Sequence, residues 1–471
     1  MTIREFAERV LMNLPYVPND QQVQLIAALA RFCSPSSTND KIFLLNGYAG
    51  TGKTSLTGSL VKSLSEAGIT SVLLAPTGRA AKVFARFAQH PAYTIHRRIY
   101  RAPAIGDASS TVSTIAENKL QNAIFIVDEA SMIGAGNGSE NGSNLLEDLI
   151  HYVYSGHNCR LILLGDTAQL PPVGCIESPA MSVKMLRSYG LRVTRAILTE
   201  TVRQTSDSGI LFNATMLRKA MRVEPLPVPA IYTSRFDDVD DISGEELADY
   251  LSNSYNRAGI DDTVVITRSN KRAVQFNQAI RANILYKEEE LTRDELLLVA
   301  KNNYYWSAKV KGMDFIANGD VATVIRVHES EYKYGYRFAD VRLSFPDKDV
   351  EIDCKILLDT LYSEAPGLEP DQLQDLYIQC IYDPDLFTPE TPMSTRLREL
   401  KKSEYFNALQ VKYAYAVTCH KAQGGQWSDV YVDMGYIPPE AQGMDFYRWL
   451  YTATSRATKR LYYVNPDITV K

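Results

Sequence analysis

The stretch Gly47-Tyr-Ala-Gly-Thr-Gly-Lys-Thr54 fits the pattern G-x-x-x-x-G-K-[ST] without deviation. An apolar run at Ile42–Leu45 precedes it, and a segment with helix-like spacing follows it. The loop is therefore expected between a buried strand and the N-terminus of a helix. Glycines allow backbone N–H groups to close around phosphate oxygens, and the helix dipole favours negative charge there. The sequence thus predicts a P-loop for nucleoside triphosphate phosphates, with the cradle formed by Gly47, Gly50, Thr51 and Gly52.

Four side chains supply the chemistry that such a loop needs. We expect Lys53 to reach the β- and γ-phosphates and the Thr54 hydroxyl to bind Mg²⁺. A second apolar run ends in the two carboxylates Asp128 and Glu129, and such a strand end faces a neighbouring P-loop in a parallel α/β sheet. Asp128 can hold the magnesium, and Glu129 can orient and deprotonate the attacking water. ATP and Mg²⁺ are therefore the predicted ligands.

Gln169 follows a third apolar run within the sequence Gly165-Asp-Thr-Ala-Gln-Leu-Pro-Pro-Val173. Its neutral amide can donate to a γ-phosphate and accept from water, which suits a sensor of nucleotide state. The alternative is a turn stiffened by two prolines in which the glutamine is merely exposed, and the residues alone leave both interpretations open.

Composition describes an ordinary globular chain. Of its 471 residues 45% are hydrophobic and 22% charged, and its six cysteines include no C-x-x-C pair, so neither a zinc site nor a disulfide framework is indicated. No apolar run approaches the ~20 residues of a membrane span, and we expect a cytoplasmic protein. A net charge of −5, taken alone, argues against nucleic-acid binding. The negative charge is concentrated, however, because residues 356–395 contain eight acids and no Lys, Arg or His. Without that block the charge is +3, and nucleic acid needs only a local basic track.

The chain is predicted to be an α/β protein with two α/β units. Four strands are expected in the first, at Lys41–Leu45, Ser71–Ala75, Ala123–Val127 and Arg160–Leu164, because short apolar runs alternate there with helical patterns. The first unit would hold residues 1–96 and 122–197, with a small insertion at 97–121. The second would hold residues 198–285 and 409–471, interrupted by a β-rich insertion, a small barrel, at 286–408. There Tyr332, Tyr334, Tyr336 and Phe338 alternate, which favours one packed face of a barrel strand over a base-stacking surface.

Nine short motifs, taken together, resemble those of superfamily 1B DNA helicases of the RecD and Dda-like group. They occur in the family's order and span nearly the whole chain: 18–22, 47–54, 75–82, 94–96, 128–131, 165–173, 198–204, 418–424 and 451–457. The chain departs from the pattern in the first insertion, where 97–121 offers Tyr100, Val112 and Ile115 but no obvious aromatic tip for a strand-separating pin.

The resemblance implies that the two units are RecA-like P-loop NTPase motor domains, and it implies further site residues. Gln22, rather than Gln21, would read the adenine edge, and Arg203 and Arg456 would be arginine fingers that stabilise charge on the transferring γ-phosphoryl group. Contacts to single-stranded DNA phosphates are implied for Thr77, His96, Thr418, His420 and Lys421.

The resulting prediction is an ATP hydrolase, a DNA helicase that acts as a monomer on single-stranded DNA and tailed duplexes; its 5′-to-3′ polarity is implied by the resemblance alone. Repair or recombination proteins are the expected partners, and no membrane is involved. One alternative is the motor subunit of a recombination or repair nuclease complex. The other is a nucleotide-gated DNA-binding protein with little unwinding of its own.

Overall fold

The computed structural model describes residues 2–34, 40–100, 114–134, 144–201, 208–310, 315–346 and 349–471. No helix among them is long and apolar enough to cross a membrane. Contacts divide these residues into two compact units. The first contains the described residues up to Ile242 and those from Ala422 onward, and the second contains Ser243–Lys421.

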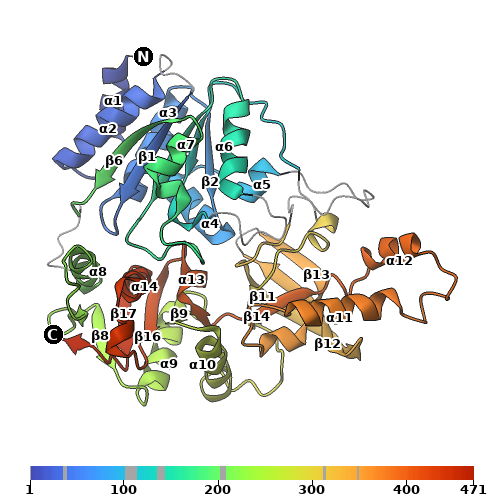
Figure 1. The fold of residues 1–471 in the computed structure, drawn as a ribbon. Coiled ribbons are helices and arrows are strands. Elements are labelled where there is room, and N and C mark those ends of the chain that lie inside the picture. The colour runs from blue at the N-terminus through green and yellow to red at the C-terminus, as the bar shows by residue number, and fades with distance from the viewer. Residues whose placement is uncertain are drawn as a thin grey trace. The chain divides into compact units, whose positions relative to one another are not determined.

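The first unit is built on a six-stranded parallel sheet (Figure 1). In spatial order its strands are β3 (Ala92–Thr94), β2 (Ser71–Ala75), β4 (Ile124–Val127), β5 (Arg160–Gly165), β1 (Lys41–Gly47) and β6 (Arg192–Leu198). The four strands predicted from apolar runs are all present, with ends within two residues of the expected ones. A parallel strand is buried on both faces, so its sequence is almost continuously apolar.

Helices cover both faces of this sheet. Phe43 and Leu45 of β1 pack into a core with α1 (Ile3–Met12), α2 (Asp20–Cys33), α3 (Lys53–Glu66) and α4 (Gly78–Ala88). Ile42 and Leu44 pack into the opposite core with α5 (Ile95–Ile99), α6 (Leu145–Ser155) and α7 (Val183–Ser188). This alternation follows from the two-residue period of a strand. It leaves the polar residues that follow β1, β4 and β5 at one edge of the sheet.

The remainder of the first unit comes from the middle and the end of the chain. Its helices are α8 (Gly209–Ala220) and α14 (Met444–Thr454), and its strands are β7 (Ala230–Ile231), β8 (Val239–Ile242), β16 (Trp427–Asp433), β17 (Ala457–Val464) and β18 (Thr469–Val470). Strand β17 pairs in parallel with both β16 and β8, and β18 pairs with β7.

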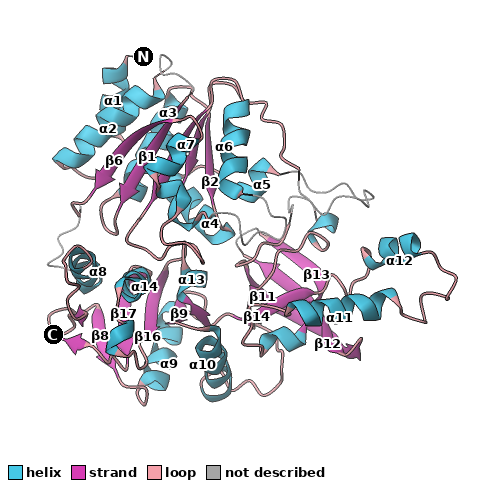
Figure 2. Ribbon diagram, in the orientation of Figure 1, coloured by secondary structure: helices cyan, strands magenta, loops and turns pink. Residues whose placement is uncertain are grey.

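The second unit contains a closed five-stranded barrel, as the sequence predicted (Figure 2). Its strands are β10 (Leu296–Val299), β11 (Val321–Lys333), β12 (Tyr336–Phe345), β13 (Val350–Leu357) and β14 (Leu409–Tyr413). The chain between β13 and β14 forms two helices, α11 (Pro370–Ile381) and α12 (Met393–Leu400). The unit also contains α9 (Leu247–Ala258), β9 (Thr263–Thr267), α10 (Asn270–Asn283), β15 (Ala416–Thr418), which pairs in parallel with β9, and α13 (Cys419–Ala422), whose last residue falls in the first unit.

The alternating aromatic residues do not lie on one strand. Strand β11 ends at Lys333 and β12 begins at Tyr336, with Tyr334 and Gly335 at φ of 54° and 80° in the turn between them. Tyr336 and Phe338 are buried against α11 and α12, whereas Tyr332 is 73% exposed. The expected single packed face is therefore wrong, because a two-residue turn preserves the alternation while reversing the chain.

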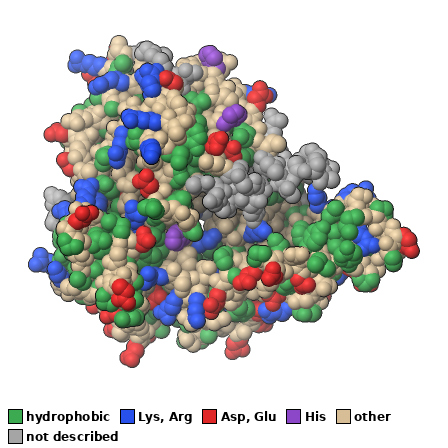
Figure 3. Space-filling model, viewed as in Figure 1, with side chains coloured by type: hydrophobic (Ala, Val, Ile, Leu, Met, Phe, Trp, Pro, Cys, Tyr) green, Lys and Arg blue, Asp and Glu red, His purple; other side chains and the backbone are tan. Residues whose placement is uncertain are grey.

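Helices α11 and α12 and the segment between them expose apolar side chains, and hydrophobic atoms gather in this region on the face seen in Figure 3. These are Ile378, Tyr382, Leu386, Met393 and Leu397. Arg396 of α12 is buried and donates to the carbonyl oxygens of Ile381, Thr388 and Thr391. Its charge therefore holds the connecting loop together.

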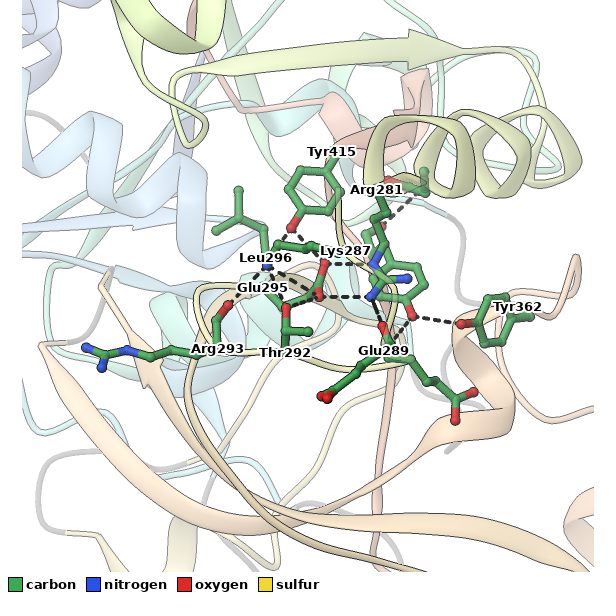
Figure 4. Close-up of polar contacts among 12 residues, drawn as sticks. Arg281, Lys287, Glu289, Thr292, Arg293, Glu295, Leu296, Tyr362 and Tyr415 are labelled. Atoms are coloured by element: carbon green, nitrogen blue, oxygen red, sulfur yellow. Dashed lines mark hydrogen bonds and ion pairs between the residues drawn. The ribbon is translucent and has the colours of Figure 1, made fainter. Parts of the chain in front are cut away.

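Glu295, just before β10, is fully buried in a network of donors (Figure 4). Arg281 of α10 donates to its carboxylate at 2.9 Å, the Tyr415 hydroxyl at 2.8 Å and the Thr292 hydroxyl at 3.1 Å. A buried carboxylate is tolerated only when it is paired and hydrogen-bonded in this way. The network ties α10 to the first strand of the barrel.

We expect Glu295→Ala to destabilise the protein by about 3–5 kcal/mol, because it leaves the buried Arg281 guanidinium without its counter-charge. Urea unfolding followed by circular dichroism measures the change. Glu288→Ala, at an exposed position in the same connection, is the matched control and should change stability by less than about 0.5 kcal/mol. Equal effects of the two substitutions would contradict a structural role for the network.

Candidate active site

The P-loop lies between β1 and α3, at the sheet edge where the sequence placed it. Gly50 and Gly52 have φ of 74° and 77°, a region that glycine enters without strain. A Cβ added at Gly50 would also lie 2.8 Å from the Leu211 side chain of α8. These two glycines are therefore required by backbone conformation, and Gly50 also by close packing.

Lys53 points into a group of three carboxylates. Its ammonium lies 3.8 Å from Asp128. Burial by itself would lower the pKa of Lys53, but the charges of Asp128, Glu129 and Asp166 outweigh it and raise that pKa above its ordinary value. Lys53 is thus held as a cation where phosphate charge would arrive.

Two of these carboxylates, Asp128 and Asp166, are affected by burial. Burial raises the pKa of Asp128 and of Asp166, against the opposing effect of Lys53. Glu129 has φ of 53°, uncommon for a residue with a side chain, and its Oε2 is buried without a hydrogen-bond partner. Strained backbone and an unsatisfied buried acceptor are features of functional sites. Glu129 therefore has an oxygen available for water or substrate.

A cavity of about 750 Å³ joins these residues to others predicted from the sequence. Gln169 lines it, is 6% exposed and has a buried Oε1 without a partner, which rules out the exposed-turn interpretation. Arg456 also lines the cavity, with its guanidinium hydrogen-bonded to the Thr452 carbonyl, the Gly425 carbonyl and the Ser455 hydroxyl. The other predicted finger, Arg203, lies outside the described residues.

Gln22 contacts the P-loop and the start of helix α2. It is 1% exposed, and its Nε2 donates to the Thr51 carbonyl at 3.0 Å and to the Tyr16 hydroxyl at 3.2 Å. Its Oε1 accepts from the backbone of Asn19, which completes a capping box at the start of α2. Gln22 thus supports the P-loop backbone, while its role toward adenine stays a prediction. Gln21 bonds instead to Thr199.

Three residues of the site were not predicted. Tyr16 lines the cavity beside the P-loop, Asp166 faces Lys53, and Tyr451 of α14 donates to Asp166 at 2.6 Å. Asp166 could have been found, because it directly follows a buried strand as Asp128 does. The two tyrosines carry no comparable signal, since an aromatic residue is most often part of a core.

The expected DNA contacts in the first unit are Thr77 and His96. Thr77 caps α4, its hydroxyl accepting from the Ala80 N–H, and lies close to Gly424, where an added Cβ would be 3.3 Å from that hydroxyl. The His96 ring packs on Tyr100 with centroids 5.6 Å apart. Burial lowers the pKa of His96, so at neutral pH the ring would meet a phosphate as a neutral donor.

The remaining expected contacts follow β15 in the second unit. Thr418 ends that strand, His420 is exposed, and the Lys421 ammonium donates to the Asn318 side chain. Burial lowers the pKa of Lys421. Their roles toward DNA remain predictions.

The donor set fits a nucleotide triphosphate with a divalent cation. The orphaned oxygens of Glu129 and Gln169 face the same cavity as the glycine cradle, Lys53, Thr54 and Asp128. Hydroxyl and carboxylate oxygens are the ligands that Mg²⁺ prefers. Fold and site together define a P-loop nucleoside-triphosphate hydrolase.

Comparison with known proteins shows which P-loop hydrolases this chain resembles. A model of the AAA domain family matches residues 18–223, and one of the UvrD-like helicase C-terminal domain matches residues 413–464. The RecD2 helicase of Deinococcus radiodurans is 32% identical over 32% of this chain and 19% of its own length. The Dda helicase of phage T4 is 25% identical over 61% of this chain and 63% of its own. An uncharacterised protein of Acanthamoeba polyphaga mimivirus is 22% identical over 89% of this chain and 94% of its own length.

Among solved structures, the Pif1 helicase from Bacteroides in complex with ADP-AlF3 and ssDNA is similar over 96% of this chain and 94% of its own, at 15% identity with a TM-score of 0.47. The structure of Pif1 helicase from Candida albicans is similar over 96% of this chain and 95% of its own, at 16% identity with a TM-score of 0.44. The two family models match in order on this chain and the RecD2 and Dda helicases are among its relatives, so the chain is similar to ATP-hydrolysing helicases.

Proposed function

We propose that the protein is an ATP-dependent DNA helicase that moves along single-stranded DNA in the 5′-to-3′ direction. One observation carries the proposal: the P-loop, the carboxylates that follow β4, Gln169 and the guanidinium of Arg456 all line one cavity. The relatives in Deinococcus radiodurans and phage T4 are both DNA helicases by name. In our proposal residues 198–285 and 409–471 form the second motor, which supplies Arg456 and Arg203.

Each residue of the site has a role in ATP hydrolysis that follows from its chemistry. The P-loop amides and Lys53 bind the phosphates of ATP, and Glu129 takes a proton from the attacking water. Gln169 contacts the γ-phosphate, and Arg456 stabilises the charge that develops on it. Thr54 and Asp128 would hold Mg²⁺, which would neutralise phosphate charge.

Movement requires DNA contacts that change with nucleotide state. Thr77 and His96 would bind phosphates in the first motor, and Thr418, His420 and Lys421 in the second. Backbone contacts position a strand without reading its sequence, so the motor would act on any sequence. Alternate strengthening of the two sets of contacts in each ATP cycle would give net movement.

Strand displacement tests the proposal. The wild-type protein and ATP are given duplexes with a 5′ or a 3′ single-stranded tail, of DNA or of RNA. We expect displacement of the 5′-tailed DNA duplex and none with Lys53→Ala. Displacement from the 3′ tail alone would refute the polarity, and a preference for RNA tails would refute the substrate. ATP hydrolysis that single-stranded DNA does not stimulate would refute the helicase.

A further inference from the structure

The segment that carries Gln169 is held at both ends by side chains from the C-terminal part of the chain. At its start the Tyr451 hydroxyl donates to Asp166 Oδ2 at 2.6 Å. At its end the Leu170 N–H donates to the Thr452 hydroxyl at 2.8 Å, and the Leu170 carbonyl accepts from the Gln423 amide at 2.7 Å. All these contacts lie within the first unit. The predicted phosphate sensor is therefore bracketed by residues that belong to the proposed second motor.

Tyr451 makes a second contact, with the P-loop itself. Its hydroxyl oxygen accepts from the backbone N–H of Ala49 at 2.9 Å, and the side chain is 1% exposed. A single hydroxyl thus joins three elements: the P-loop, the segment after β5, and helix α14. Its hydrogen bond to Asp166 is buried, and a bond to a buried carboxylate is among the stronger kinds.

The partner of this hydroxyl is part of the charge balance around Lys53. The charge of Asp166 helps to raise the pKa of Lys53, and Lys53 in turn opposes the effect of burial on Asp166. Phosphates that bind to Lys53 would change this balance. The Tyr451 hydroxyl is positioned to transmit such a change to α14, the helix that ends just before Arg456.

We propose that Tyr451 is a positioning residue that couples the occupancy of the nucleotide site to the second motor, through its paired contacts with Asp166 and Ala49. The inference rests on the proposed function, because the coupled event is the binding of single-stranded DNA. Coupling between two ligands is reciprocal. If nucleotide changes DNA affinity through this hydroxyl, DNA changes nucleotide turnover through it as well.

The test is Tyr451→Phe, which removes only the hydroxyl. Tyr447→Phe is the matched control: Tyr447 lies one turn earlier on α14, is also 1% exposed, and donates to the Pro227 carbonyl at 2.9 Å, away from the nucleotide cavity. Each variant loses the hydroxyl of a tyrosine that is 1% exposed, and thermal unfolding of each variant shows whether it remains folded at the assay temperature. Affinity for a fluorescent single-stranded oligonucleotide is measured without nucleotide and with a non-hydrolysable ATP analogue, beside steady-state ATP hydrolysis with and without DNA.

We expect Tyr451→Phe to bind DNA like the wild type without nucleotide but to lose most of the change that the analogue causes. DNA-stimulated kcat should fall about tenfold, with KM for ATP within about twofold. Tyr447→Phe should keep the wild-type response. A full nucleotide-dependent change in Tyr451→Phe, or the same loss in both variants, would overturn the inference. Absence of any DNA stimulation in the wild-type protein would instead overturn the proposed function.

Discussion

Lys53→Ala should lower ATP hydrolysis by about 10³-fold or more and abolish strand displacement. Its ammonium lies among Asp128, Glu129 and Asp166, where it would attract the γ-phosphate directly from the P-loop. A charged donor in a water-poor site stabilises developing charge far more than it would in water. Turnover measured by phosphate release, with saturating single-stranded DNA, gives the loss directly.

A matched control separates this effect from damage to α3. Lys62→Ala removes an exposed lysine of the same helix and should leave turnover and displacement unchanged. Normal DNA-stimulated hydrolysis in Lys53→Ala would contradict the proposed role of Lys53 in binding the phosphates of ATP. Equal losses in both variants would show that the helix, and not the ammonium, had been disrupted.

The same substitution should leave a signature in the pH dependence of stability. Burial already raises the pKa of Asp128 and Asp166, and Lys53 is the group that opposes it. A carboxyl group whose pKa is higher in the folded state than in the unfolded state stabilises the fold fully at pH values below its unfolded-state pKa. This stabilisation is lost as the pH rises through the folded-state pKa. The melting temperature of Lys53→Ala should therefore fall more steeply than that of the wild type as pH increases from about 4 toward neutrality. A parallel pH profile would contradict the charge arrangement.

The sequence predicted the strands and the charged residues of the site because both carry local signals. Strand β2 has the expected ends, and those of β1, β4 and β5 lie within two residues of the expected ones, since a buried parallel strand is a short apolar run bounded by turns. Asp128 and Glu129 were found because two carboxylates follow such a run. The barrel was expected from its β-rich pattern, although helix α11 within the same region was not part of that prediction.

Other features depend on contacts that no local pattern reports. The turn at Tyr334 and Gly335 was missed because aromatic alternation continues across it, although a glycine at that point is a turn signal. The capping box of Asn19 and Gln22 is readable from the sequence, and it explains why the Gln22 amide is largely engaged. Tyr451 meets Asp166 across 285 residues of chain, and spacing cannot indicate such a pair.

Arg456→Ala should lower DNA-stimulated turnover by about 10³- to 10⁵-fold, the range for loss of an arginine finger. The side chain is 4% exposed on the wall of the nucleotide cavity. There it is held by two carbonyl oxygens and one hydroxyl, neutral acceptors that leave its charge uncompensated. That charge favours the transition state over the ground state, because negative charge grows on the γ-phosphoryl group during transfer. ATP binding, measured with a fluorescent analogue, should therefore change by less than about threefold.

Two further variants make this prediction specific. Arg456→Lys keeps the charge but loses the planar fork that can contact two phosphate oxygens, so its turnover should lie between those of the wild type and Arg456→Ala. Arg448→Ala removes an arginine of the preceding helix α14 whose guanidinium donates to the Ile176 carbonyl and does not line the cavity, and turnover should remain normal. Equal loss of ATP binding and hydrolysis in Arg456→Ala would count against the finger, because a group that acts on the transition state has little effect on the affinity for substrate.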